Sequence, residues 1–313
     1  MARFLITGGA GFIGSRICEM LIENGHFVRV IDNLSTGKIE NLNEIINNPN
    51  FEFIKADICD FNACLKLSKD VDYIVHEAAL VSVPMSIEMP KETNTINIDG
   101  FLNILEAARI NKIKKVIYAS SSAVYGDNQD KEKVEENIGN VISPYALSKR
   151  INELYANLYY RVYGLNSVGL RYFNVYGPKQ DPSSEYSGVI SIFMKRVIEN
   201  QDLNIYGDGT IVRDFVYVDD VAKANLLAIN LEKEGAFVYN IGTNIPTTIL
   251  DLAQTVIKIS KKDLQINFLP PRKGDILYSL ANIEKAKNEL DYRPTVTLKE
   301  GLNLIYNVLN NKR

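Results

Sequence analysis

The stretch Thr7-Gly8-Gly9-Ala10-Gly11-Phe12-Ile13-Gly14 lies between a short apolar run at residues 4–7 and an amphipathic segment at residues 13–24. A strand, a glycine-rich turn and a helix in this order form the context in which such a motif binds a dinucleotide pyrophosphate. Gly8 permits a tight turn, Gly11 lets the backbone approach the phosphates, and Gly14 lets the helix pack closely against the strand. The N–H groups and the positive end of the helix dipole attract the phosphates. The stretch therefore predicts that the chain starts with a Rossmann-type unit.

Asp32 follows the next apolar run, at residues 27–31. A carboxylate about 20 residues after the glycines hydrogen-bonds the adenosine ribose hydroxyls and repels a ribose 2′-phosphate. We therefore expect the cofactor NAD rather than NADP. The alternative, a solvated acid at the end of a strand, stays open.

Strand-like runs alternate with amphipathic segments through the first half of the chain, which predicts a parallel sheet covered on both faces. After residue 171, glycine and proline punctuate shorter elements, and a strand at 237–241 can return to the sheet. We expect an α/β fold, a doubly wound parallel Rossmann sheet with a second, smaller α/β substrate-binding lobe. The predicted strands are residues 4–7, 27–31, 51–55, 71–76, 115–120 and 167–171; the helices are 13–24, 94–110, 144–163, 221–231 and 248–260; the domains are 1–171, with 215–242 returning to its sheet, and 172–313.

Composition narrows the function classes. The 313 residues are 46% hydrophobic and 23% charged with a net charge of −3, so charge does not indicate nucleic-acid or anionic-membrane binding. No apolar run approaches the roughly 20 residues that cross a bilayer. Three cysteines without metal-ligand spacing predict reduced thiols in a cytoplasmic protein, and the two histidines are expected to be structural, so no metal site is predicted. These residues are Cys18, Cys59, Cys64, His26 and His76.

Tyr145 and Lys149 are spaced i and i+4, so they share one face if the segment is helical. Ser143 as N-cap and Pro144 in the first turn give that helix a start. A cation about 5 Å from the phenol, at an effective dielectric constant of about 20, lowers the pKa of the phenol by about 2 units and makes it a usable base. Ser120-Ser121-Ser122 ends a predicted strand at the sheet edge where ligands bind. A chance surface pair and a strand-end turn remain the alternatives.

Several further motifs, all in order along nearly the whole chain, resemble the extended short-chain dehydrogenase/reductase family, and within it the NAD-dependent UDP-sugar 4-epimerases. Besides the glycine stretch they are HEAA (76–79), SSSAVYG (120–126), SPYALSK (143–149), LRYFNVYGP (170–178), GDGTIVRDFVYVDD (207–220) and PRKGD (271–275). The resemblance implies a Tyr145 base, its partner Lys149, and an active hydroxyl on Ser121, with Ser122 as second choice.

The resemblance also implies which residues bind each ligand. For NAD they are Gly8, Gly11, Phe12, Ile13, Gly14, Asp32, Asn33, Asp57, Ile58, Ala78, Ala79 and Asn97, together with Tyr145 and Lys149. For a UDP-sugar they are Ser121, Asn174, Arg213, Arg272, Asp275 and Ser279. In this reading Arg213 and Arg272 clamp the two phosphates, because a planar guanidinium fork suits phosphate.

The implied reaction is reversible C4 epimerisation of a UDP-hexose through a 4-keto sugar, with NAD tightly bound. Relatives that dehydrate or decarboxylate carry an acid inside the SxxVYG stretch, where this chain has Ser122 and Ala123. A small Ser279 at the position that gates the C2 substituent implies that UDP-GlcNAc/UDP-GalNAc and UDP-Glc/UDP-Gal are substrates, whereas a one-residue slip would place Tyr278 there. A 4,6-dehydratase, a UDP-glucuronate-modifying enzyme and a non-catalytic NAD sensor are the alternatives. The family also implies a homodimer through residues 94–110 and 144–163, where a stripe of four tyrosines offers an interface.

Overall fold

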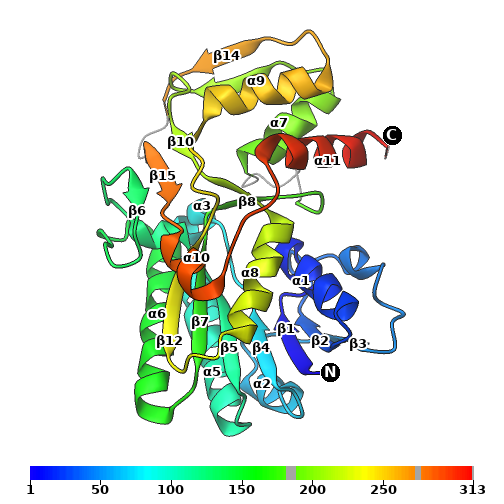
Figure 1. The fold of residues 1–313 in the computed structure, drawn as a ribbon, viewed down its shortest axis with the longest axis vertical. Helices are drawn as coiled ribbons and strands as arrows, with labels where there is room; N and C mark the ends of the chain where they lie inside the picture. The colour runs from blue at the N-terminus through cyan, green and yellow to red at the C-terminus, as the bar shows by residue number, and fades with distance from the viewer. Residues whose placement is uncertain (181–187, 272–275, 312–313) are drawn as a thin grey trace.

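Seven parallel strands form the central sheet of the computed structural model, which describes residues 1–180, 188–271 and 276–311 (Figure 1). Their order is β12-β7-β5-β4-β1-β2-β3, and every neighbouring pair is parallel. The order reverses between β1 and β4, which is where such sheets open a crevice at their carboxyl ends. The strands are β1 (Arg3–Thr7), β2 (Phe27–Asp32), β3 (Phe51–Lys55), β4 (Tyr73–His76), β5 (Lys115–Ser121), β7 (Ser167–Tyr172) and β12 (Ala236–Ile241).

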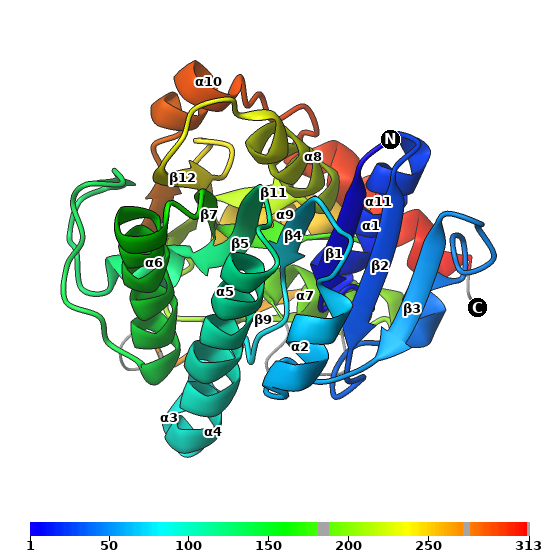
Figure 2. The ribbon, with the colours of Figure 1, turned by 90° about the horizontal axis from the view of Figure 1, so that it is seen from below.

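Helices cover both faces of this sheet (Figure 2). Successive strand side chains point to opposite faces. Phe4 and Ile6 therefore join the core beneath α1 and α8, whereas Leu5 joins the core beneath α2, α5 and α6. This arrangement confirms the predicted doubly wound α/β fold. The helices are α1 (Phe12–Glu23), α2 (Phe61–Leu67), α5 (Gly100–Ile110), α6 (Pro144–Tyr163) and α8 (Val218–Asn230).

The predicted helix at residues 94–110 differs from the structure. The chain forms α4 (Pro90–Asn94), then a π-turn at η2 (Thr95–Asp99), and only then α5. A π-turn adds a residue to the helical repeat and often marks a functional site, and periodicity alone does not reveal it. Strands β5 and β7 also run one residue further than predicted, so that Ser121 and Tyr172 pair across the sheet.

The smaller lobe has its own apolar core, built mainly from α7, α9, α11, β9 and β11. β12 lies at the edge of the main sheet, and the division into lobes at residue 171 remains a prediction. No helix in the described part of the chain is both long and apolar enough to span a bilayer. The remaining elements are η1 (Ile39–Leu42), α3 (Val83–Glu88), η3 (Ser122–Tyr125), β6 (Glu132–Lys133), β8 (Asn174–Tyr176), α7 (Val189–Ile198), β9 (Leu203–Tyr206), β10 (Val212–Arg213), β11 (Phe215–Tyr217), β13 (Thr247–Thr248), α9 (Ile249–Ser260), β14 (Ile266–Leu269), β15 (Tyr278–Ala281), α10 (Glu284–Leu290) and α11 (Leu298–Asn310).

Candidate active site

The glycine-rich turn leaves its backbone uncovered by side chains at the N-terminus of α1. Gly8 has a φ of +69°, and a Cβ atom there would lie 2.6 Å from the backbone nitrogen of Ala78. A Cβ atom on Gly14 would lie 2.3 Å from the carbonyl oxygen of Gly8. Gly11 is the N-cap, no side chain caps the helix there, and its first turn carries no acidic residue. The turn therefore offers N–H groups and a positive dipole end to an anion, which fits the pyrophosphate of NAD.

The side chains of Phe12 and Ile13 point away from the glycine-rich turn. Both pack against the apolar core of the smaller lobe, and a Cβ atom on Gly177 would lie 2.9 Å from the Phe12 ring. Any contact of these two residues with a dinucleotide would therefore come from their backbone N–H groups.

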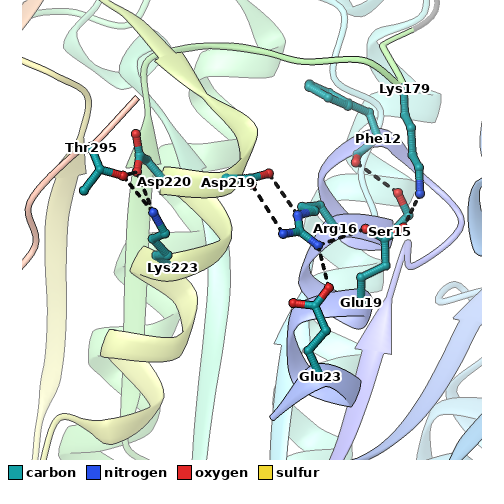
Figure 3. A network of polar contacts seen from close by, with 10 residues as sticks. All are labelled: Phe12, Ser15, Arg16, Glu19, Glu23, Lys179, Asp219, Asp220, Lys223 and Thr295. Carbon is teal, nitrogen blue, oxygen red and sulfur yellow. Dashed lines mark hydrogen bonds and ion pairs between the residues drawn. The ribbon is translucent and has the colours of Figure 1, made fainter. Parts of the chain in front are cut away.

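Polar contacts tie α1 to segments far away in the sequence (Figure 3). The Arg16 guanidinium donates two hydrogen bonds to the Asp219 carboxylate of α8, at 2.9 and 3.3 Å. Lys179, which follows β8, donates to Glu19 of α1 and, at 2.6 Å, to the carbonyl of Asn41. These contacts hold the phosphate-binding helix against α8 and against the segment that follows β8. They could not be predicted from the sequence, because no local pattern pairs residues 138 to 203 positions apart.

Three of the four residues expected near the adenosine gather at the ends of β2 and β3. Asp32 accepts hydrogen bonds from the backbone of Ala10 and of Leu34, but burial outweighs both and raises the pKa of its carboxyl group. Asn33 donates to Asp57 at 2.9 Å. Burial acts to raise the pKa of Asp57, and hydrogen bonds from its neighbours, Asn33 included, outweigh it and lower that pKa.

Ile58 points into the core between α2 and α5, where a Cβ atom on Gly100 would lie 2.7 Å from its side chain. A contact between Ile58 and adenine would have to come from its backbone. The contact itself stays a prediction.

Asn97 serves the protein backbone in this structure. Its amide accepts a hydrogen bond from the Leu80 nitrogen at 2.7 Å and donates to the Leu80 carbonyl at 2.9 Å and to the Ser148 hydroxyl at 3.1 Å. The π-turn that carries Asn97 thereby fixes the segment of Ala78 and Ala79 to α6. The contacts of these three residues with NAD remain predictions.

Tyr145 and Lys149 lie one turn apart on the face of α6 that meets β5. The Ser143 hydroxyl caps the helix by accepting a hydrogen bond from the Ala146 nitrogen, as the sequence predicts. The Lys149 ammonium donates to the carbonyl of Ala119 at 2.9 Å and lies 6.0 Å from the centre of the Tyr145 ring. The cluster therefore sits at the carboxyl edge of the sheet.

Of the two candidate serines, Ser121 pairs with the phenol. Its hydroxyl hydrogen-bonds to Tyr145 and accepts from the Ala123 nitrogen at 3.1 Å. Ser122 begins the turn η3 that follows β5. This geometry favours Ser121 over Ser122 as the active hydroxyl.

Burial dominates the titration of the Tyr145–Lys149 pair. It raises the pKa of the Tyr145 phenol, against a hydrogen bond from Ser121 that lowers it, and it lowers the pKa of Lys149 to about 8. The expectation that Lys149 lowers the phenol pKa is therefore wrong for the protein alone. Removing the phenol from water outweighs the effect of Ser121, and the nearby ammonium is aimed at the Ala119 carbonyl.

Three of the residues expected to bind substrate lie on short strands outside the central sheet: Asn174 on β8, Arg213 on β10 and Ser279 on β15. Arg213 of β10 donates to the carbonyl of Ile276 at 2.7 Å and pairs in parallel register with Ser279 of β15. Asn174 donates its amide to the carbonyl of Asp214 at 3.0 Å. Arg272 and Asp275 lie outside the described residues. The structure thus brings Arg213 and Ser279 together, and the predicted substrate contacts of all five residues stay predictions.

Glu77, within HEAA, is a polar residue of the site for which no role was predicted from the sequence. It directly follows β4, and its carboxylate accepts a hydrogen bond from the Tyr172 hydroxyl at 2.8 Å. The Asn225 amide of α8 donates to the same hydroxyl at 2.8 Å. The sequence signal that could have indicated Glu77 is an acidic residue directly after an apolar strand, β4, which pairs with β1.

Known proteins resemble the chain along its whole length. The model of the NAD dependent epimerase/dehydratase family matches residues 4–242. A UDP-glucose 4-epimerase of Mycolicibacterium smegmatis is 36% identical over 312 residues, which are 99% of each chain. The crystal structure of the Thermotoga maritima UDP-glucose 4-epimerase with UDP-glucose is 41% identical with a TM-score of 0.93, over 99% of both chains.

The UDP-N-acetylglucosamine 4-epimerase of Methanobrevibacter ruminantium, solved with UDP-N-acetylmuramic acid, is 40% identical with a TM-score of 0.95. The match covers 100% of this chain and 99% of that one. Sequence and fold agree, and the chain belongs to the NAD dependent epimerase/dehydratase family.

Proposed function

We propose that this protein catalyses the reversible C4 epimerisation of a UDP-hexose. The observation that carries the proposal is the cluster of Tyr145, Ser121 and Lys149 at the carboxyl edge of the sheet, beside the glycine turn that fits NAD. The relatives named above as UDP-sugar 4-epimerases support it. Bound NAD supplies a hydride acceptor and donor at C4.

In this reaction Tyr145 takes the proton of the sugar 4-hydroxyl while the C4 hydrogen leaves as hydride, which gives a 4-keto sugar. Ser121 holds the sugar oxygen against the phenol through its hydroxyl. Lys149 offsets the negative charge of the phenolate across the 6.0 Å that separates it from the ring. The sugar then presents its other face, hydride returns to C4, and Tyr145 gives its proton back to the oxygen. Atoms and electrons balance without a second substrate.

The segment after β5 supports epimerisation over elimination of water or carbon dioxide. Those reactions require an extra proton transfer, and positions 122 and 123 carry serine and alanine instead of an acid. A 4,6-dehydratase remains the second candidate, because the family model includes dehydratases. The mass of the product separates the two, since epimerisation leaves it unchanged and dehydration removes one water.

For the sugar, we propose that both N-acetylated and plain UDP-hexoses are accepted. Side chains paired in parallel register lie on the same face, so Ser279 shares the face of Arg213 and Tyr278 that of Val212. Tyr278 is 38% exposed, and the Lys131 ammonium lies 5.8 Å from its ring. This register supports Ser279, and not Tyr278, as the residue that limits the C2 substituent.

The test is to incubate the NAD-loaded protein with UDP-GlcNAc and with UDP-Glc and to separate the products by chromatography. We expect UDP-GalNAc and UDP-Gal. A Ser279→Tyr variant should lose UDP-GalNAc turnover by at least about tenfold and keep UDP-Gal turnover, since a phenol crowds an acetamido group. Full UDP-GalNAc activity in that variant would remove Ser279 from the gate. Inactivity of the wild-type protein on every UDP-hexose, with NAD bound, would favour a sensor.

We also propose a homodimer formed through α5 and α6. An exposed apolar stripe runs along α6 at helical spacing, with Leu147, Leu154, Leu158 and Val162 each 46–58% exposed. Tyr159, by contrast, donates to Glu106 of α5 within the same chain, so leucine and valine offer a better interface than the tyrosine stripe. Sedimentation measures the mass in solution. A cytoplasmic location is part of the proposal, since Cys18, Cys59 and Cys64 are free thiols.

A further inference from the structure

Glu77 places a carboxylate at the carboxyl edge of the sheet, one residue beyond the pair of His76 and Tyr118. Its position after β4 puts it next to β1 and β5, and the hydrogen bond from Tyr172 of β7 holds its Oε1 atom in place. Asn225 of α8 fixes Tyr172 in turn, and also donates to the Val221 carbonyl at 3.0 Å. Three elements therefore orient a carboxylate that has no part in the proposed reaction.

Lys149 is the charged neighbour of this carboxylate. His76 pairs in register with Tyr118, so Glu77 lies beside Ala119, and the Lys149 ammonium donates to the Ala119 carbonyl at 2.9 Å. In agreement with this placement, Glu77 raises the pKa of Lys149 against burial, and Lys149 lowers that of Glu77. The other titratable groups around Glu77 stay neutral, since burial raises the pKa of the Cys18 thiol and of the Tyr145 and Tyr172 phenols and lowers the pKa of His76 to about 3. Of these neighbours, Lys149 alone is cationic near pH 7.

We propose that Glu77 is a positioning residue for catalysis, whose ionised carboxylate keeps Lys149 in its ammonium form beside Tyr145. The inference rests on the proposed function, in which Lys149 assists the Tyr145 base. Burial without a counter-charge favours the neutral amine. A neutral amine cannot offset the charge of the Tyr145 phenolate, so the alkaline limit of activity depends on whether Glu77 is ionised.

The test compares Glu77→Gln with the wild type in the NAD-loaded protein. Glutamine keeps an acceptor for Tyr172 and removes the charge. Because burial raises the pKa of Glu77 to about 7, the two proteins should have equal kcat/KM at pH 6, where Glu77 is protonated. At pH 8 to 9 the variant should be about tenfold slower, because a fall of about one unit in the pKa of Lys149 is a tenfold change. A loss by the same factor at every pH, or an unshifted alkaline limb, would overturn the proposal.

Two further variants test whether the effect on the alkaline limb belongs to Glu77. Glu135→Gln removes another buried carboxylate, one that accepts a hydrogen bond from the Asn240 nitrogen, and should leave the alkaline limb in place. Tyr172→Phe keeps the Glu77 carboxyl group and deletes the hydrogen bond that lowers its pKa. The pH above which Glu77 supports kcat/KM should therefore be higher in Tyr172→Phe than in the wild type. The same pH in both proteins would contradict the role of Glu77.

Thermal unfolding gives a readout without turnover. A carboxyl group whose pKa rises on folding destabilises the folded protein as pH increases from its ordinary pKa of about 4.3 to about 7. The Tm of Glu77→Gln minus that of the wild type should therefore be near zero at pH 4.5 and grow until pH 7 to 8. A Tm difference that does not change with pH would contradict the proposal for Glu77. If the Tm difference is as expected but the wild-type protein does not epimerise any UDP-hexose, the proposed function is contradicted instead.

Discussion

Two polar clusters lie back to back on β5, α6 and β7, and they differ in how completely their charges are hydrogen-bonded. Ser120 and Arg171 point into one cluster, while Ser121 and Tyr172, the next residue on each strand, point into the other. The two share α6, which contributes Glu153 to the first and, one turn earlier, Lys149 to the second. Alternation along a strand thus separates two sites by a single residue.

The first cluster is saturated with hydrogen bonds. Arg171 makes a two-pronged contact with Glu153 at 2.8 and 2.9 Å and donates to the Tyr125 hydroxyl at 3.0 Å. Ser120 and Arg150 also donate hydrogen bonds to the Glu153 carboxylate. Burial favours the neutral forms, yet these bonds lower the pKa of Glu153 and raise that of Arg171.

The cation of the second cluster is as buried as that of the first, but its pKa shifts in the opposite direction. Lys149 and Arg171 are each 2% exposed. Lys149 makes its hydrogen bond to a carbonyl, and Glu77 receives one from a phenol, so burial lowers the pKa of Lys149 to about 8 and raises that of Glu77 to about 7. The comparison teaches that hydrogen bonding, more than burial, decides whether an interior charge is fixed or available for proton transfer.

The largest effect is expected from breaking the saturated cluster. Arg171→Met removes the buried counter-charge of the Glu153 carboxylate and leaves it only the more exposed Arg150, which should lower the free energy of unfolding by about 3–5 kcal/mol. Denaturant unfolding at pH 7 measures it. In the double variant Arg171→Met/Glu153→Met the loss should be smaller, because no unpaired charge remains. A double variant less stable than the single one would show that the ion pair itself carries the stability.

A smaller effect, on turnover, should separate the two clusters through one phenol in each. Tyr145→Phe should reduce kcat by at least about 10²-fold, equivalent to about 2.7 kcal/mol, with little change in stability. Tyr125→Phe removes a hydroxyl that donates to Asn240 at 2.6 Å and accepts from Arg171, so it should cost about 1–3 kcal/mol of stability and leave kcat within a few-fold. Steady-state rates and Tm values of both variants measure these effects on turnover and stability. Near-normal turnover by Tyr145→Phe would remove the phenol from its role.

The sequence predicted what is local or periodic. Apolar runs and i, i+4 spacing predicted β1 to β5 and β7, the capped start of α6 and the pairing of Tyr145 with Lys149, but not the two-residue strand β6. It did not predict the π-turn that aims Asn97 at Leu80, nor the role of Glu77, because both depend on contacts between distant segments. It also gave the wrong direction for the pKa of Tyr145, since burial is a property of the folded chain.

The smallest effect is expected from the contacts between α1 and α8 (Figure 3). They are hydrogen-bonded like the first cluster, but Arg16 and Asp219 are more exposed to water than the ion pair of Arg171 and Glu153. The side chains of Arg16 and Asp219 are 23% and 32% exposed, so water screens their attraction. A double-mutant cycle with Arg16→Ala and Asp219→Ala should give a coupling energy of about 0.5–1 kcal/mol that falls as salt rises from about 0.1 to 1 M. Urea unfolding of the four proteins at both salt concentrations measures it. A coupling of about 3 kcal/mol, or one insensitive to salt, would place this pair with Arg171 and Glu153, and hydrogen-bond geometry would then outweigh exposure in setting what an ion pair contributes.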